Sequence, residues 1–178
     1  MEYQLIKRCR VSKKNDLVTV GKFPKMYLTG IFPKNKNKKI PEVPFEIVYS
    51  KSSKLLQLKH HYNPKLLYGK NYGYMSRLNP SMINHLKKKS IYLKKKIKYN
   101  KKNFILDIGS NDGTYLNFYN GSNVYGIDPS IKKFKKYYKK NIIKLPFFFD
   151  KAFKKIKKKN FKLISSIAMF YDLKDPVL

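Results

Sequence analysis

The stretch from Phe104 to Ser130 constrains the fold of this chain more than any other part of its sequence. It opens with a short apolar run, Phe104–Leu106, of the kind found in buried parallel strands. Gly109 and Gly113 follow, with polar residues between them. This pattern predicts a strand, a glycine-bearing turn and the start of a helix, which together form a place where a ligand can bind.

An acidic residue stands at the end of the next predicted strand. The second apolar run, Val124–Ile127, stops at Asp128 and Pro129, about 20 residues after the glycine turn. In an open parallel sheet, the carboxyl ends of the strands form the rim where ligands bind. A carboxylate at that rim can accept two hydrogen bonds from a ribose diol, and glycines let the backbone approach a ligand closely. The glycines are also compatible with an ordinary turn between a strand and a helix.

Strand and helix patterns continue to alternate after this stretch. The segment Ile131–Lys139 predicts an amphipathic helix, and Ile142–Phe149 predicts a third strand. Ala152–Lys158 would be its crossover helix, and Phe161–Met169 a fourth strand. Units of this length imply an α/β fold with a parallel sheet and right-handed crossovers, in which the strand order switches beside the glycine turn.

The motifs of this region resemble those of a known family. DIGSNDG at Asp107–Gly113 and GIDPS at Gly126–Ser130 are similar to the S-adenosylmethionine loop of class I methyltransferases. The resemblance is specifically to the sugar carbon-methyltransferases that act on nucleotide-linked keto sugars. Two further segments agree with that family, NYGYMSRLNPSMINH at Asn71–His85 and SSIAMFYDLKDP at Ser165–Pro176. All of these segments follow the family's order, and together they span most of the chain.

The resemblance implies S-adenosyl-L-methionine as the cofactor and a Rossmann-like sheet that binds it. In the family, the glycine loop surrounds the methionine part and the ribose, an acidic residue binds the ribose diol, and the fourth-strand segment flanks the methyl group. The cofactor-binding residues implied here are Asp107, Gly109, Asn111, Asp112, Gly113, Asp128, Ala168, Met169 and Phe170. Related enzymes also bring a tyrosine over the active site, and the resemblance gives that catalytic role to Tyr74. Tyr74 and its neighbours Tyr68 and Tyr72 are also explained as a cover for the core face of the next helix.

The reaction implied by the resemblance runs through an enolate. A base removes the proton next to the keto group of the sugar, and the carbanion attacks the sulfonium methyl group. The family carries its proposed base, a histidine close to a tyrosine and a glutamate, in a part of the sheet that would follow Leu178. We therefore expect the N-terminal part of a longer protein, or a truncated gene, that is inactive alone. The C-terminal half would then be a further segment of the same protein or a separate partner chain, and without it the fourth strand would be left as an exposed apolar edge.

The N-terminal part of the chain predicts a small β-rich module. Two β-prone runs, Leu17–Val20 and Phe45–Tyr49, are separated by a segment rich in prolines. The prolines expected to break this segment are Pro33, Pro41 and Pro44.

In the resembled family, this module binds zinc through two CxxC knuckles. The first knuckle here runs from Cys9 to Ser12, and Ser50 and Ser53 occupy the thiolate positions of the second, so serines replace three of the four thiolates. A neutral hydroxyl is a poor zinc ligand beside a thiolate. We therefore expect a degenerate module without zinc.

Two neighbouring histidines, His60 and His61, could stand in as metal ligands. Neighbouring side chains of a strand point to opposite faces. This geometry favours solvent exposure or a packing role over metal binding.

A helical connector is predicted between the module and the cofactor-binding part. Asn79 before Pro80 is a helix start signal, with asparagine as the N-cap and proline at the first helical position. An apolar stripe follows, and the lysine-rich run 87–102 predicts a solvated face. The sequence thus predicts three parts, which are a degenerate zinc-binding-like module at 1–62, a helical connector at 63–102 and the N-terminal half of a Rossmann-like domain at 103–178.

The formal charge of +31 is consistent with a polyanionic partner such as RNA or DNA. However, only Arg8, Arg10 and Arg77 are arginines, the residue suited to bidentate recognition of phosphates and bases. The lysines are spread through the chain, as a coding bias towards AT-rich codons would produce. The alternative interpretation is a lysine-rich nucleic-acid-binding protein, or an RNA or DNA methyltransferase with the same cofactor loop. A third interpretation is a non-catalytic remnant.

The sequence predicts neither a membrane span nor a secretory signal. No apolar run approaches the length of a span, and the N-terminus, MEYQLIKRCR, has no apolar core after its charges. The single cysteine is compatible with a reducing compartment. We therefore expect a cytoplasmic protein that acts on a small-molecule sugar nucleotide and has no membrane partner.

Overall fold

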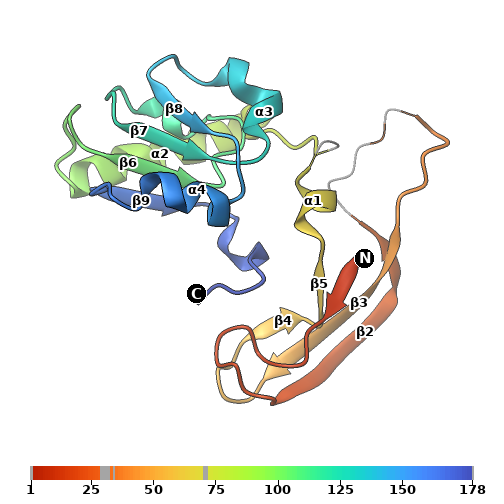
Figure 1. The fold of residues 1–178 in the computed structure, drawn as a ribbon. Coiled ribbons are helices and arrows are strands. Elements are labelled where there is room, and N and C mark those ends of the chain that lie inside the picture. Colours follow the sequence, from red (N-terminus) through yellow and green to blue (C-terminus); the bar gives the residue numbers. More distant parts are fainter. Residues whose placement is uncertain (1, 29–32, 34, 70–71, 178) are drawn as a thin grey trace. The chain divides into compact units, whose positions relative to one another are not determined.

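The computed structural model describes residues 2–28, 33, 35–69 and 72–177, which fall into two compact units (Figure 1). The first unit comprises residues 1–73 and 171–178, and the second comprises residues 74–170. These boundaries differ from the three parts expected from the sequence, because the connector helix packs into the core of the second unit. Asn71, where one family-like segment begins, lies outside the described residues.

The first unit consists of two small antiparallel sheets. One has three strands in the order β2-β3-β4, and the other pairs β1 with β5. The predicted β-rich module is therefore confirmed. Its elements are β1 (Tyr3–Leu5), β2 (Leu17–Tyr27), β3 (Glu42–Ser50), β4 (Leu56–Leu58), β5 (His60–Tyr62) and the short helix α1 (Pro64–Leu67).

The expectation that Pro44 breaks the module is wrong, because Pro44 lies within β3. Phe23 pairs with Phe45 and Met26 with Val43, so two residues of β2 face Pro44 alone. Proline has no N–H to donate to the ladder and is tolerated at such a bulge.

The second unit is built on a parallel sheet in the order β8-β7-β6-β9 (Figure 1). Ile108 at the end of β6 pairs with Ile127 on one side and with Ser166 on the other, so the carboxyl ends of three strands lie level. The predicted α/β fold with a parallel sheet is confirmed. Its strands are β6 (Ile105–Ile108), β7 (Val124–Ile127), β8 (Ile142–Leu145) and β9 (Leu163–Ser166).

Two apolar cores lie on opposite faces of this sheet. Successive strand residues point to opposite faces, so Ile105 enters one core, with Leu86, and Leu106 enters the other, with Ala152. Both faces are covered, as parallel sheets generally require. The covering helices are α2 (Pro80–Lys96) and α3 (Ile131–Phe134) on the first face and α4 (Phe149–Ile156) on the second.

Two predicted helices are shorter than the sequence suggested. The helix expected after the glycine turn is a single 3₁₀ turn, η2 (Leu116–Phe118). The helix expected over 131–139 is α3 followed by a second 3₁₀ turn, η3 (Lys135–Tyr137). The chain leaves helical geometry here because Tyr138 is extended and its hydroxyl lies 2.8 Å from Ser110 Oγ in the core. A tertiary hydrogen bond thus overrides the local helical pattern.

Other boundaries also shift from the expected ones. Strand β8 ends at Leu145 because Pro146 follows, and proline cannot continue the ladder. Helix α4 begins at Phe149 rather than at Ala152, and β9 covers only the middle of the predicted fourth strand.

Helix α2 begins as predicted. The side chain of Asn79 accepts hydrogen bonds from the amides of Ser81 (3.0 Å) and Met82 (3.3 Å), and Pro80 occupies the first turn. Leu86 and Ser90 are buried, whereas most lysines of the helix are exposed. Within the described ranges, no helix is long and apolar enough to cross a membrane.

Replacing Asn79 with alanine should lower the free energy of unfolding by about 1 kcal/mol, because two amides of the first turn lose their acceptor. Asn79→Asp keeps an acceptor and should remain close to the wild type. Urea denaturation followed by circular dichroism measures both. Equal stability of the two variants would contradict the capping role.

Candidate functional site

The glycine loop is tied directly to the end of β7. The amides of Gly109 and Ser110 both donate to the carbonyl of Ile127, at 2.8 and 3.1 Å. The loop then closes on itself, because the Gly113 amide donates to Ser110 O at 2.9 Å. The loop and the end of the neighbouring strand therefore form one connected rim.

Protein side chains fill the space that the two loop glycines leave open. Gly109 has φ +79°, and a Cβ added there would lie 2.8 Å from Met169 Cβ. Gly113 has φ +80°, and a Cβ added there would lie 2.6 Å from the ring of Tyr138. Both the backbone conformation and the packing therefore require glycine at these positions.

Asp128 lies beside this loop, at the end of β7. Its Oδ2 accepts the amide of Asn111 (2.9 Å) and its Oδ1 accepts the amide of Ser130 (2.7 Å). Burial raises the pKa of Asp128, although the bonds from Ser130 and Asn111 oppose the shift. A carboxylate has about four acceptor positions, and three are used by the side chain and amide of Ser130 and the amide of Asn111, so about one remains for a ligand.

Asn111 and Asp112 hold the segment that contains Tyr74. The Asn111 amide group donates to Tyr74 O (3.1 Å), and Asn111 Oδ1 accepts the backbone amide of Ser76 (3.0 Å). Asp112 Oδ2 accepts the amide of Arg77 (2.9 Å). The structure thus brings Tyr74, whose side chain is 42% exposed, to the glycine loop. These hydrogen bonds between the glycine loop and the segment of Tyr74 were not predicted from the sequence. The only feature of the sequence that could have indicated them is the Asn-Asp pair inside the turn.

Asp107 lies below the rim rather than on it. Its side chain is buried in the second unit and accepts a hydrogen bond from Ser165 Oγ at 2.6 Å. Burial, with a smaller contribution from the charge of Asp128, raises the pKa of Asp107 to about 7, and the Ser165 bond opposes the shift. Asp107 thus connects β6 to β9 under the loop.

The segment after β9 also reaches the loop. Met169 packs against Gly109 and joins the second apolar core. Ala168, at φ +55°, and Phe170, with 52% of its surface accessible, are exposed. Of the predicted site residues, Met169 therefore builds the rim, whereas Ala168 and Phe170 remain available to a ligand.

An open hollow of about 240 Å³ adjoins the same loop. Asp112, Thr114 and Asn117 line it, together with Arg77 and Tyr137. The Arg77 guanidinium lies 4.0 Å from the centroid of the Tyr137 ring, a cation–π contact. Nothing in the sequence pattern marked Arg77 as part of this region.

In the first unit, the four knuckle positions lie together. Cys9 Sγ is 3.1 Å from Ser53 Oγ and 3.5 Å from the amide of Ser12, while the Ser53 amide donates to Ser50 Oγ at 3.4 Å. Burial tends to raise the pKa of the Cys9 thiol, but hydrogen bonds from Ser12, Ser53 and Ser50 outweigh it and lower the pKa to about 6. One thiol and three neutral hydroxyls do not fit the thiolate donor set that zinc prefers.

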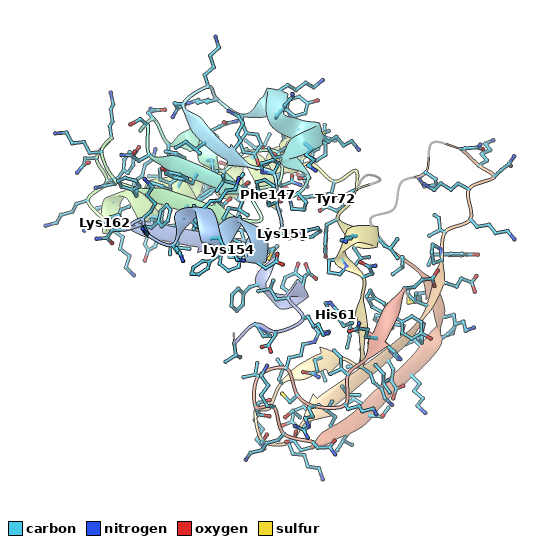
Figure 2. All side chains as sticks on the ribbon, viewed as in Figure 1. His61, Tyr72, Phe147, Lys151, Lys154 and Lys162 are labelled. Atoms are coloured by element: carbon cyan, nitrogen blue, oxygen red, sulfur yellow. The ribbon has the colours of Figure 1, made fainter. Side chains whose placement is uncertain are left out.

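The histidines do not complete a metal site. His60 and His61 are both buried, which supports the predicted packing role and contradicts solvent exposure (His61 is labelled in Figure 2). His60 packs edge-on against the ring of Tyr3, with centroids 5.3 Å apart. Throughout the part of the chain that the structure describes, no group of three or more His, Cys, Asp or Glu side chains could hold a metal ion.

Comparison with known proteins shows what both units of this chain resemble. Residues 9–68 match the model of a family described as "Putative zinc binding domain". The chain is also 27% identical over 129 residues to the C-methyltransferase NovU of Streptomyces niveus, an alignment that covers 70% of this chain and 30% of that relative. The resemblance of this chain to the N-terminal part of C-methyltransferases, and of its first unit to a putative zinc binding domain, is thereby confirmed.

Replacing Asp107 with asparagine should make the stability of the second unit less dependent on pH. The folded-state pKa of about 7 lies above the unfolded value of about 3.9, so the wild type loses stability as pH rises between these values. Asparagine keeps an acceptor for Ser165 but carries no charge. We expect Asp107→Asn to melt at a higher temperature than the wild type at pH 8, with a smaller difference at pH 5.

Thermal unfolding across this pH range measures the effect, with Asp150→Asn on the exposed face of α4 as the control. An Asp107→Asn profile parallel to that of the wild type would contradict the raised pKa.

Proposed function

We propose that the second unit binds S-adenosyl-L-methionine at the rim formed by β6, β7 and β9. It would be the cofactor-binding half of a carbon-methyltransferase that acts on a nucleotide-linked keto sugar. The observation that carries the proposal is the joining of Asp128 to the glycine loop through the Asn111 amide, at the level ends of adjacent parallel strands. The strand order β8-β7-β6-β9 supports a Rossmann-like sheet, whose ligand crevice lies where the order reverses.

Each site residue has a role in this proposal. The carboxylate of Asp128 would bind the ribose diol, and the loop Gly109–Gly113 would surround the ribose and the methionine part. Ala168 and Phe170 would flank the methyl group. Tyr74, held by Asn111, would lie over the reacting centre. When bound, the cofactor supplies an electrophilic methyl group, and the protein positions it and excludes water.

Methylation beside a keto group also needs a base that removes a proton from carbon. The chain has three histidines, of which His60 and His61 are buried in the first unit and His85 is exposed on α2. None of them belongs to the rim described above. We therefore propose that these 178 residues bind the cofactor without transferring its methyl group.

Cofactor binding should depend on the carboxylate of Asp128. Asp128→Asn is isosteric and keeps one acceptor oxygen, but it loses the acceptor of one backbone amide. It also loses the charge-assisted hydrogen bonds to the diol, which are each worth about 1.5–3 kcal/mol. We expect at least about tenfold weaker binding of S-adenosyl-L-methionine in isothermal titration calorimetry. Asp150→Asn is the matched control. Unchanged affinity in a folded Asp128→Asn variant would remove the cofactor assignment.

Substitution of Gly109 is a poorer test of cofactor binding. A valine there would collide with Met169, so lost binding would also report lost packing.

Methyl transfer by these 178 residues to nucleotide-linked keto sugars should stay at background. A general base typically contributes about 10²–10⁴-fold, and positioning of the sugar contributes more. Incubation with methyl-labelled cofactor and a panel of keto-sugar nucleotides tests this expectation. Turnover that His85→Ala abolishes would instead identify His85 as the base.

Binding of a nucleic acid is a second candidate function, favoured by the uncompensated charge. Against a formal charge of +31, the described residues form two ion pairs, Lys13–Asp175 and Lys59–Glu46. Exposed lysines such as Lys154 and Lys162 lie on the second unit (Figure 2). A phosphate-binding protein loses affinity linearly with the logarithm of salt concentration, with a slope of about 0.9 per phosphate contacted on duplex DNA. Salt-dependent binding of a labelled oligonucleotide therefore distinguishes the two functions.

A further inference from the structure

The two degenerate knuckles of the first unit share one backbone conformation. In the first, the Cys9 amide donates to Lys14 O (3.0 Å) and the Lys13 amide donates to Cys9 O (3.0 Å). In the second, the Ser50 amide donates to Leu55 O (2.9 Å) and the Lys54 amide donates to Ser50 O (2.9 Å). The hydrogen bonds therefore join equivalent positions in both loops.

Two further features repeat in both loops. Lys13 and Lys54, which follow the last knuckle positions, have φ values of +61° and +60°. Such a conformation is uncommon for a residue with a side chain, so two matching instances indicate the same loop type. The amide three residues after the first knuckle position also points at its side chain, from Ser12 to Cys9 Sγ and from Ser53 to Ser50 Oγ.

In a zinc module, a metal ion would connect the two loops. Here, hydrogen bonds connect them at the same place. Cys9 Sγ contacts Ser53 Oγ at 3.1 Å, and Ser52 Oγ donates to Ser12 Oγ at 3.0 Å. Cys9 and Ser50 are buried, with 1% and 0% of their surfaces accessible. In tetrahedral zinc sites, sulfur atoms lie roughly 3.8 Å apart. The Cys9–Ser53 contact is shorter, as a direct hydrogen bond is, and it brings one ligand position of each knuckle together.

Asp16 completes this network from outside the knuckles. The Ser50 hydroxyl donates to Asp16 Oδ1 (2.9 Å), and the Ser52 amide donates to Asp16 Oδ2 (2.6 Å). The buried hydroxyl of Ser50 is therefore satisfied without a metal, as buried polar groups require.

We propose that a hydrogen-bonded cluster of Cys9, Ser12, Ser50 and Ser53, closed by Asp16, replaces zinc as the cross-link of the first unit. The loops retain the backbone of a metal site although the metal ligands have been lost. Two consequences follow. The native chain folds without zinc, and returning thiolates to the three serine positions is sufficient to create a zinc site. The proposal is independent of cofactor binding by the second unit.

The direct test compares the native chain with the triple variant S12C/S50C/S53C. Elemental analysis after dialysis should find no zinc on the native chain and one zinc per chain on the variant. A chelator should lower the melting temperature of the variant and leave that of the native chain unchanged. The matched control is S12C/S53C/S122C, which has the same number of thiols but moves one of them from a knuckle position to exposed Ser122 in the second unit. The control should lose its zinc on dialysis.

Two results would overturn the proposal. A folded triple variant that binds no zinc would show that the loops do not retain a metal-binding backbone. Stoichiometric zinc on the native chain, lost in Cys9→Ala, would show that other residues hold a metal.

A second measurement does not depend on folding of the triple variant. Ser50→Ala removes the donor to Asp16 and should lower the melting temperature of the native chain, whereas Ser122→Ala in an exposed bend should not. Equal melting temperatures for these two variants would show that the cluster is not a cross-link.

Discussion

The second unit depends on the hydrogen bonds that continue the pairing of β6 with β7 past the ends of both strands. Two successive loop amides, from Gly109 and Ser110, share the carbonyl of Ile127, and the next amide, from Asn111, donates to the side chain of Asp128. The ladder thus changes from backbone acceptors to a carboxylate acceptor within three residues. This change fixes the loop and the acidic side chain relative to each other, and Asn111 and Asp112 then attach the segment of Tyr74 to the loop.

Features that depend on local chemistry were predictable from the sequence. The apolar run Val124–Ile127 coincides with β7, because a strand buried on both faces is apolar throughout and ends where polar residues begin. The Asn79 cap was also predictable, since its donors lie two and three residues away. The 3₁₀ turns and the side chains that pack against the glycine loop were not predictable. They depend on Tyr138 and Met169, which enter the loop from distant parts of the chain.

In the first unit, too, contacts between distant residues were not predictable from the sequence. The sequence shows that serines replace the thiolates, which argues against zinc, but it does not show that the four positions still meet. Their meeting depends on pairing between β3 and its neighbours and on positive φ values at Lys13 and Lys54, residues that have no intrinsic preference for that conformation. A chain can therefore lose its zinc-binding thiolates and still keep the geometry of the two loops. This structure has lost three thiolates and has kept the loop geometry.

The candidate site is acidic, whereas the rest of the chain is strongly basic. Residues 74–170 contain four acidic residues, and three of them lie in or beside the glycine loop; the fourth is Asp150. Repulsion among these three contributes to the raised pKa values of Asp107 and Asp128. A cationic ligand would relieve this repulsion, and the proposed cofactor carries a positive sulfonium. Lysines on the outside repel the same cation, but salt screens exposed charges more than buried ones. Salt therefore weakens the repulsion by the exposed lysines more than it weakens the attraction by the buried carboxylates.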